Sequence, residues 1–525
     1  MHVEKSSTAS SAQNKSSIPA ARRPLFHFPA PHFLSLLESS LRSKPALFAF
    51  LSSFLLLLLF HQILVPKALS PSPPSSSLDP APRTATHTTT RSDATTDPPH
   101  PLSPLVHDEG DETRIFRPYG SAAALFVVYG AYRGGPNTFA VVGLGSKPLY
   151  VYGKPEFECY WIPARSPSSK QADTDPPFKS KRAYSMLPDY GFGRVYTVVV
   201  VNCTFEEDVG TSPDQRGGQL ILYATHGDGL GKPAERIVAL SEDEHSYNAS
   251  FYQPPYPYEF VYCGSPLFSN LNPQRIREWI AYHVMLFGPK SHFIFHDAGG
   301  MHEGVRAVLE PWKKRGFITI QNVKQTTQYD GYYYNQFLLV NDCLHRTRFM
   351  ANWTFFFDVD EFIYIGPDTS LREILKWHAN STQLSFQQLR MSDALCQFEE
   401  PDNDSRWAFE KLVYGERFQD MKYAVQARQV FATGVHYSQK ELGHMEGNMG
   451  WAWWPHMHFY HYHNTISEHG KLCRNITNNA SNFTLDGKSY VFDTSMVSLA
   501  PLVKKFELEL IGHENTTQMS STKGL

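Results

Sequence analysis

From about Tyr256 the chain alternates short apolar strands with amphipathic helices, and this pattern constrains the fold more than any other feature. Asn272 and Pro273 are typical of a helix start, and apolar residues then recur at helical spacing as far as Gly288, which favours a helix end. The alternation continues with expected strands at 292–296, 317–321 and 353–358 and expected helices at 305–314 and 336–346. Because β-α-β units form right-handed crossovers, we predict an α/β domain with a mainly parallel sheet and a ligand site at the carboxyl ends of its strands.

Residues 106–253 show a different pattern, in which short runs rich in Val, Tyr and Phe are separated by turns that contain Gly and Pro. The expected strands are 123–129, 139–144, 149–152, 195–201 and 220–225. Such short strands without a helical period predict a β-sandwich-like module. Its residues Tyr132, Tyr160 and Trp161 are candidates to stack on sugar rings, although packing in the module's own core explains each of them equally well.

A charge-free apolar segment, 46–65, precedes both parts and is long enough to cross a bilayer as one helix. The residues before it carry an excess of Lys and Arg, so the positive-inside rule predicts a cytosolic tail at 1–45 and a signal anchor at 46–65. Residues 66–105 are rich in Pro, Ser and Thr and are expected to form a stem. A buried core helix at 46–65 is disfavoured because the segment has no amphipathic stripe.

Nine N-glycosylation sequons follow the anchor and support a luminal location for the rest of the chain. They lie at Asn202, Asn248, Asn352, Asn380, Asn403, Asn475, Asn479, Asn482 and Asn515. A short tail, one anchor, a stem and a large luminal part form the layout of Golgi glycosylation enzymes. By this analogy we expect a single-pass type II protein of the Golgi membrane with its catalytic domain (254–525) in the lumen.

Three carboxylates, Asp358, Asp360 and Glu361, interrupt the very apolar segment 353–364. Burial of carboxylates requires a neutralising partner. In an extended chain Asp358 and Asp360 point to one side and Glu361 to the other, and two same-facing carboxylates suit Mg²⁺ or Mn²⁺ bound to a diphosphate. One alternative is a solvated turn at the strand end. A glycosidase is disfavoured, because it needs two carboxylates about 5–10 Å apart on opposite sides of a sugar.

A histidine-rich segment, 456–463, provides further metal ligands, and we expect at least one of its histidines to reach the cation. Zinc is a rival, but cysteine partners at zinc spacing are absent from the sequence. Lys471 and Arg474 are candidates to hold phosphate oxygens. Three tryptophans are candidates for a platform on which an acceptor chain stacks, and packing in the core is an equally good explanation for them: Trp451, Trp453 and Trp454.

The segment Phe357–Phe362, taken with Asn341-Asp342-Cys343 upstream and with Lys422, His436 and His461-Tyr462 downstream, resembles glycosyltransferase family 92, and in particular its plant galactan synthases. The resemblance covers about 256–511. It implies a type-A glycosyltransferase fold, an inverting Mn²⁺-dependent reaction, UDP-galactose as the donor and β-1,4-galactan side chains of pectin as the acceptor. The module at 106–253 resembles a carbohydrate-binding domain.

The resemblance also assigns roles to individual residues. Asp358 and Asp360 match the family's D-x-D metal motif, and His461 fits its C-terminal histidine ligand, with His436 as the alternative. The nucleotide-sugar candidates are Asp342, Lys422, Lys471 and Arg474. No residue matches the family's catalytic base clearly, so three candidates stay open, namely Asp393, Glu400 and Glu410.

The amino-acid composition limits the classes of molecule that this protein can bind. Lys and Arg number 48 against 51 Asp and Glu, for a net charge of −3, which excludes a protein held to nucleic acid mainly by its charge. Six cysteines are compatible with a few bridges, including Cys159–Cys203 in the module and any of three pairings among the four others. The sequence leaves both a monomer and a homodimer open. The alternative functions are a membrane-anchored glycan-binding protein with an inactive transferase domain and, less favoured, a metal-dependent hydrolase.

A secreted fragment that begins near residue 105 should be soluble without detergent, because the only expected span is 46–65. It should also lose mass when an N-glycosidase removes its glycans. Centrifugation and gel mobility check both expectations. A fragment that stays in the membrane pellet, or that keeps its mass, would contradict this topology.

Overall fold

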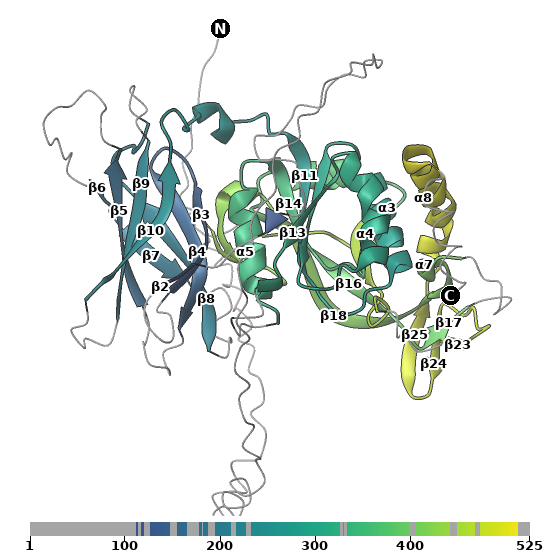
Figure 1. Cartoon of the computed structure of the whole chain (residues 1–525). Coiled ribbons are helices and arrows are strands. Elements are labelled where there is room, and N and C mark those ends of the chain that lie inside the picture. The colour runs from purple at the N-terminus through teal and green to yellow at the C-terminus, as the bar shows by residue number, and fades with distance from the viewer. Residues whose placement is uncertain are drawn as a thin grey trace, which may run out of the picture. The chain divides into compact units, whose positions relative to one another are not determined.

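Figure 1 shows a computed structural model of the chain. It describes residues 112–113, 117–119, 126–146, 155–164, 178–180, 182–186, 195–211, 217–226, 233–325, 329, 333–397, 406–441, 449–467 and 473–512. The expected tail, anchor and stem, the expected strand 149–152, and the site candidates Glu400 and Lys471 lie outside these ranges. Within these ranges no helix is long and apolar enough to cross a membrane.

Two antiparallel sheets pack face to face in the first part of the described chain, which is a sandwich arrangement (Figure 1). One sheet has the order β2 (Arg117–Tyr119), β3 (Phe126–Arg133), β4 (Thr138–Ser146), β8 (Tyr196–Thr204) and β7 (Arg182–Met186). The other has the order β10 (Glu235–Glu242), β9 (Gly218–His226), β5 (Pro155–Pro163) and β6 (Phe178–Lys179). Cys159 on β5 and Cys203 on β8 form a disulfide between the two sheets.

Alternation explains why this sandwich forms: along β5 the side chains of Phe157, Cys159 and Trp161 are buried between the sheets, and Glu156 and Glu158 are exposed. Trp161 stacks on Phe139 within that core, with ring centroids 5.4 Å apart. Trp161 is therefore a core residue and not an exposed sugar platform.

The second part is an α/β domain built on a 12-stranded sheet. Its main path runs β1 (Glu112–Thr113), β13 (Ile318–Asn322), β12 (Ser291–Asp297), β11 (Tyr258–Leu267), β14 (Ala351–Phe356), β18 (Tyr414–Val425), β16 (Gln383–Met391), β22 (Met457–His461) and β15 (Glu361–Ile365). β21 (Met449–Trp451) pairs with β16, and β25 (Lys488–Phe492) pairs with β18 and β24 (Asn482–Leu485). Two small sheets pair β17 (Leu395–Cys396) with β23 (Arg474–Asn475), and β19 (Val430–Thr433) with β20 (Ser438–Glu441).

The sheet is mixed, so the prediction of a mainly parallel sheet is wrong for the pairings of β18 and for the pairing of β15 with β22, although β16 pairs in parallel with β21 and β22. The strands from β1 to β14 pair in parallel, as the alternation with helices predicts, but β18 pairs antiparallel with both β14 and β16, and β15 pairs antiparallel with β22. A parallel neighbour needs a crossover of a dozen residues or more, usually a helix. The strand-helix alternation that predicted such crossovers ends at β14.

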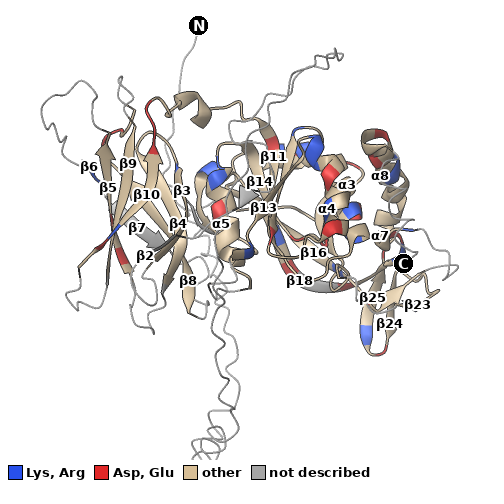
Figure 2. Ribbon diagram, viewed as in Figure 1, with Lys and Arg blue, Asp and Glu red and all other residues tan. Residues whose placement is uncertain are grey.

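The helices of the α/β domain are α3 (Pro273–Phe287), α4 (Glu303–Lys314), α5 (Gln336–Arg346), α6 (Leu371–Trp377), α7 (Ala408–Lys411) and α8 (Ser495–Ile511), and two 3₁₀ turns are η1 (Ala249–Tyr252) and η4 (Ala427–Gln429). The sequence predicted α3 correctly. The Asn272 side chain accepts hydrogen bonds from the backbone N–H groups of Gln274 and Arg275, and Gly288 ends the helix with φ of 81°. Acidic and basic residues are interspersed on α3, α4 and α8 (Figure 2), in keeping with the balanced composition.

A short link bends the large sheet. Only four residues, 357–360, join β14 to β15, although β18, β16 and β22 lie between these two strands. In a flat sheet four strand spacings amount to about 19 Å, which is more than the roughly 17 Å that five extended residue steps can span. The sheet must therefore curl, and the curl brings strands from its middle and its edge together around this link.

One apolar cluster joins the sandwich to the α/β domain. It contains Val127, Val142 and Val200 from the five-stranded sheet together with Leu338 and Leu339 of α5. Both faces of that sheet are thus buried, one against the four-stranded sheet and one against α5. This burial gives the sandwich a structural role as a cover for α5.

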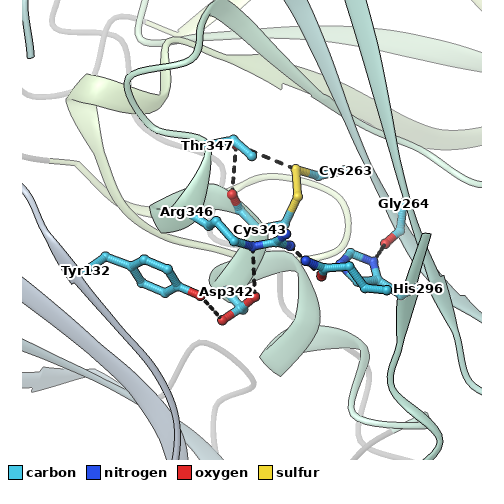
Figure 3. Close-up of a disulfide and its surroundings, with 9 residues drawn as sticks. Tyr132, Cys263, Gly264, His296, Asp342, Cys343, Arg346 and Thr347 are labelled. Atoms are coloured by element: carbon cyan, nitrogen blue, oxygen red, sulfur yellow. Dashed lines mark hydrogen bonds and ion pairs between the residues drawn. A yellow bond between two sulfur atoms is a disulfide. The ribbon is translucent and has the colours of Figure 1, made fainter. Parts of the chain in front are cut away.

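Polar contacts accompany this cluster (Figure 3). The Tyr132 hydroxyl on β3 donates a hydrogen bond to Asp342 on α5, and Arg346 lies 3.4 Å from the same carboxylate. Gly130 allows the close approach, because a Cβ at this position would lie 2.5 Å from the Asp342 Oδ1 atom. The disulfide Cys263–Cys343 ties α5 to β11, and Cys396–Cys473 is the second bridge of the α/β domain.

Leu338→Ala should destabilise the whole described unit by about 2–5 kcal/mol, since it leaves a cavity between the sandwich and α5. Thermal unfolding should show one transition that moves to lower temperature. Leu508→Ala, which truncates an exposed leucine of α8, is the matched control and should change little. Two separate transitions, only one of which moves, would show that the sandwich folds independently of α5.

Candidate functional site

The candidate site lies at the carboxyl ends of the parallel strands β11 and β14. β12 lies on one side of β11 and β14 on the other, so the order of the parallel strands reverses at β11, and ligands of α/β sheets bind at the carboxyl ends of the strands at such a point. Ser265 in the last part of β11 donates a hydrogen bond to Asp358, which follows β14. This contact joins polar groups that lie at the carboxyl ends of the two neighbouring strands.

The three carboxylates occupy a tight turn and not an extended strand. The Glu361 N–H donates to the Asp358 carbonyl at 3.1 Å, and the Asp358 N–H donates to the Glu361 carboxylate at 2.7 Å. From α3, the Trp279 indole N–H donates to the carbonyl oxygens of both residues, at 3.1 and 2.8 Å. The expectation that Glu361 faces away from Asp358 is therefore wrong, because the turn folds its carboxylate back over the backbone of Asp358.

A buried lysine neutralises this turn. Lys422 on β18 is 3% exposed, and its Nζ lies 2.7 Å from Asp358 Oδ2 and 3.5 Å from Glu361 Oε2. Burial raises the pKa of Asp358, but the charge and hydrogen bond of Lys422 outweigh burial and lower the pKa to about 2. Burial raises the pKa of Glu361 to about 7, against the opposing charge of Lys422. Burial lowers the pKa of Lys422, yet the carboxylates raise it above its usual value, so the lysine stays charged.

Asp360 faces His461 across the turn. Asp360 Oδ2 lies 3.5 Å from His461 Nε2, and the other ring nitrogen of His461 lies 3.1 Å from the amide oxygen of Gln388. Burial lowers the pKa of His461, but the hydrogen bond and charge of Asp360 outweigh it and raise the pKa to about 9. Gln388 thus orients the imidazole so that Nε2 points at the Asp360 carboxylate.

This pair fits a divalent cation. Two ligands at about 2.1 Å from one octahedral ion lie roughly 3 Å apart, close to the separation of Asp360 and His461. No group of three or more His, Cys, Asp or Glu side chains in the described ranges has metal-site geometry. Because Mg²⁺-like ions usually take one or two protein ligands and complete their shell with phosphate and water, two ligands suffice.

Of the catalytic-base candidates, the structure brings Asp393 to this edge. In the parallel pair of β16 and β22, Arg390 is the register partner of His461, and Asp393 follows three residues later. Asp393 accepts a hydrogen bond from the Asn464 side chain at 3.2 Å, and Arg390 contacts His463 at 3.3 Å.

Glu410 has structural contacts instead. Its carboxylate accepts from the Trp407 N–H at the start of α7 and forms an ion pair with Lys504 of α8, at 2.6 Å each. These two contacts occupy its carboxylate. Glu400 lies outside the described residues.

The remaining candidates have other partners. His436 Nδ1 lies 3.1 Å from Asp420 and 2.9 Å from the Met421 carbonyl. Asp342 contacts Tyr132 and Arg346 at the sandwich (Figure 3), and the exposed Arg474 lies 3.6 Å from Asp486. The tryptophans that could form an acceptor platform are exposed, at 41% for Trp451, 76% for Trp453 and 46% for Trp454.

Sequence reasoning missed Ser265, Gln388 and Arg390 as neighbours of the acidic turn, whereas His463 belongs to the histidine-rich segment 456–463 that it had singled out. Gln388 and Arg390 lie on a strand whose partner register with β22 appears only in the folded sheet. The single available signal was the position of Ser265 at the end of the first strand of the α/β domain, where ligand sites are expected.

The mixed α/β sheet with an acidic turn at the carboxyl ends of its parallel strands is consistent with a glycosyltransferase fold. The family model of glycosyltransferase family 92 matches residues 258–497. Galactan beta-1,4-galactosyltransferase GALS1 of Arabidopsis thaliana is 47% identical over 407 residues, which cover 76% of this chain and 79% of the relative. For GALS3 of the same plant, with the same enzyme name, the identity is 42% over 439 residues, 81% of this chain and 84% of the relative. The chain therefore belongs to glycosyltransferase family 92, and it is a glycosyltransferase.

Glu361→Gln tests the electrostatics of the turn in chelator-treated protein. The pKa of Glu361 is about 7 when folded and near its ordinary 4.5 when unfolded, so between these values the folded state holds more protons and its stability falls as pH rises. The variant lacks this proton linkage. We expect its free energy of unfolding, relative to the parent, to increase from pH 4.5 to pH 7. A pH-independent difference in denaturant titrations would contradict the raised pKa.

Proposed function

We propose that this glycosyltransferase transfers galactose from UDP-galactose to β-1,4-galactan with inversion at the anomeric carbon, using a bound Mn²⁺. The names of the Arabidopsis relatives support galactan as the acceptor. One observation carries the proposal: the side chains of Asp360 and His461 face each other, and the neighbouring Asp358 is already neutralised by Lys422. In this proposal the α/β domain has a type-A glycosyltransferase fold.

Asp360 and His461 would hold the cation, which supplies charge neutralisation for the departing diphosphate. Asp358 has a different task. Its carboxylate is engaged by Lys422 and by the Ser265 hydroxyl, so it anchors the turn that carries Asp360. Glu361 fixes the same turn through the Asp358 N–H.

Asp393 is the proposed general base. It would accept the proton of the acceptor hydroxyl as this oxygen attacks the anomeric carbon of galactose. Arg390 and His463, which lie at the same end of β16 and β22, would position the transferred sugar between Asp393 and the diphosphate. The partly exposed position of Asp393 leaves it open to an acceptor.

The acceptor has two candidate surfaces. Near the start of β22, Trp454 stacks on His458 with ring centroids 3.6 Å apart, and Trp453 is among the most exposed large side chains of the described residues. In the sandwich, Tyr160 is partly exposed against Tyr223. We propose that the tryptophans contact the growing chain and that the sandwich holds polysaccharide in addition to covering α5.

We further propose that the enzyme works in the Golgi lumen, held to the membrane by the segment 46–65. Release of UDP from UDP-galactose, measured with and without a galacto-oligosaccharide, tests the activity. Release that needs the oligosaccharide supports the transferase. Release without it indicates a hydrolase, and no release with retained galactan binding indicates a glycan-binding protein with an inactive domain.

Asp360→Asn should lower the transfer rate by two or more orders of magnitude and should raise the Mn²⁺ concentration needed for activity. A lost charge-assisted ligand costs a few kcal/mol, and each ~1.4 kcal/mol lowers the rate tenfold.

Asp358→Asn should lower activity similarly and should also lower the unfolding temperature, because it leaves buried Lys422 without its closest partner. Asp368→Asn, the same change at an exposed aspartate, is the control for both. Parental turnover by both folded variants would disprove the metal site.

A further inference from the structure

An aromatic cluster that has no role in the proposed mechanism lies at the same edge of the sheet as the acidic turn. Tyr333 and Tyr334, just before α5, are 56% and 44% exposed. Phe268, which follows β11, stacks on Tyr334 with ring centroids 4.0 Å apart and an interplanar angle of 15°. The Tyr333 ring stands nearly perpendicular to both, at 84° to Phe268 and 85° to Tyr334. The stacked pair therefore supports a third ring that solvent can reach.

The backbone here is in an unfavourable conformation. Tyr333, Tyr334 and Asn335 have φ values of 46°, 55° and 60°, and none of them is glycine. Three consecutive residues in the left-handed region cost free energy, and they persist only where the surroundings enforce them. The enforcing contacts are a hydrogen bond from the Gln336 N–H to the Tyr333 carbonyl at 3.1 Å and one from the Asn335 side chain to the Tyr329 carbonyl at 2.9 Å. Strain of this kind concentrates at ligand sites.

Hydrogen bonds connect the cluster to the acidic turn. The Gln336 side chain donates to the Ser265 hydroxyl at 2.5 Å, and Ser265 donates to Asp358. The charges of Asp358 and Asp360 reach the Tyr333 hydroxyl, whose pKa is raised by burial and, to a smaller extent, by these two carboxylates. Phe268 and Asp358 thus follow the carboxyl ends of the neighbouring parallel strands β11 and β14.

We propose that Tyr333 is the stacking platform for the pyrimidine base of the nucleotide sugar, and that the Phe268–Tyr334 pair holds its ring in place. This inference rests on the proposed function, because it takes a uridine nucleotide as the donor. Every nucleobase has a π-face that stacks on aromatic side chains, and a ring braced in advance loses little conformational entropy on binding.

The positions of the other groups favour a nucleobase over an acceptor sugar at this platform. The acceptor must approach the galactose beyond the diphosphate, on the side away from the nucleoside. Asp393 and His463 lie at the ends of β16 and β22, whereas Tyr333 lies beside β11 and α5. In this proposal the diphosphate lies at Asp360 and His461, the nucleoside extends toward Tyr333, and the transferred sugar extends toward Asp393.

The proposal is tested by calorimetric titration of the detergent-solubilised full chain. UDP and inorganic diphosphate are titrated separately, each in the presence of Mn²⁺. Tyr333→Asn removes the ring but suits the backbone, because asparagine tolerates the left-handed region. It should weaken UDP binding about tenfold or more, and it should leave diphosphate binding unchanged. Tyr333→Phe keeps the π-face and should bind UDP as the parent does. Trp377→Ala removes another exposed aromatic ring, at the end of α6, and is the matched control.

Unchanged UDP affinity of Tyr333→Asn, or an equal loss for UDP and diphosphate, would overturn the assignment. A raised KM for galacto-oligosaccharide with unchanged UDP affinity would assign the ring to the acceptor and would overturn it as well. Failure of the unsubstituted chain to bind UDP would instead overturn the proposed donor, and with it the uridine site. If Tyr333→Asn does not fold, as judged by circular dichroism, the same titrations on Tyr333→Ser decide the question.

Discussion

The candidate site depends on one buried charge. Lys422 lies beneath the turn between β14 and β15, and its ammonium group contacts Asp358 and faces Glu361. Without the Lys422 ammonium group, two carboxylates would be placed together at the end of an apolar strand, which is costly in a low-dielectric interior. With it, the turn can hold Asp358 and Glu361 as structural acids and leave Asp360 to face His461. Asp358 and Glu361 therefore stabilise the turn, and Asp360 is the acid that is available to a metal ion.

The same helix that borders the site also carries the sandwich. α5 begins just after Tyr333 and Tyr334, is tied to β11 by the Cys263–Cys343 disulfide, and packs with Leu338 and Leu339 against the five-stranded sheet. Because both faces of that sheet are buried, the sandwich and the α/β domain share their stability through α5. A change in the sandwich near Tyr132 or Gly130 would thus reach Asp342 and the helix without any contact with the acidic turn.

The curl of the large sheet explains how residues that are distant in sequence meet at one place. Ser265, Asp360, Gln388, Lys422 and His461 come from five different segments, and the short link between β14 and β15 draws the middle and the edge of the sheet together around them. The aromatic cluster before α5 is connected to the same turn, because Gln336 donates a hydrogen bond to Ser265 and Ser265 donates one to Asp358.

The sequence by itself determined the local elements and the chemical character of the site. Helix α3 follows from its Asn-Pro start and Gly end, the parallel half of the sheet follows from alternation, and the cluster of acids at 358–361 marks a neutralised site. Only the tertiary structure decided how that neutralisation is achieved, because Lys422 reaches the acids through an antiparallel pairing of β18 that no local period encodes. It also turned Glu361 toward Asp358, directed Asp342 to Tyr132 and Glu410 to Lys504, and selected one of three cysteine pairings. Periodicity reports which face of a segment is buried, whereas the partner of a charge or a sulfur depends on contacts between segments that are tens to hundreds of residues apart.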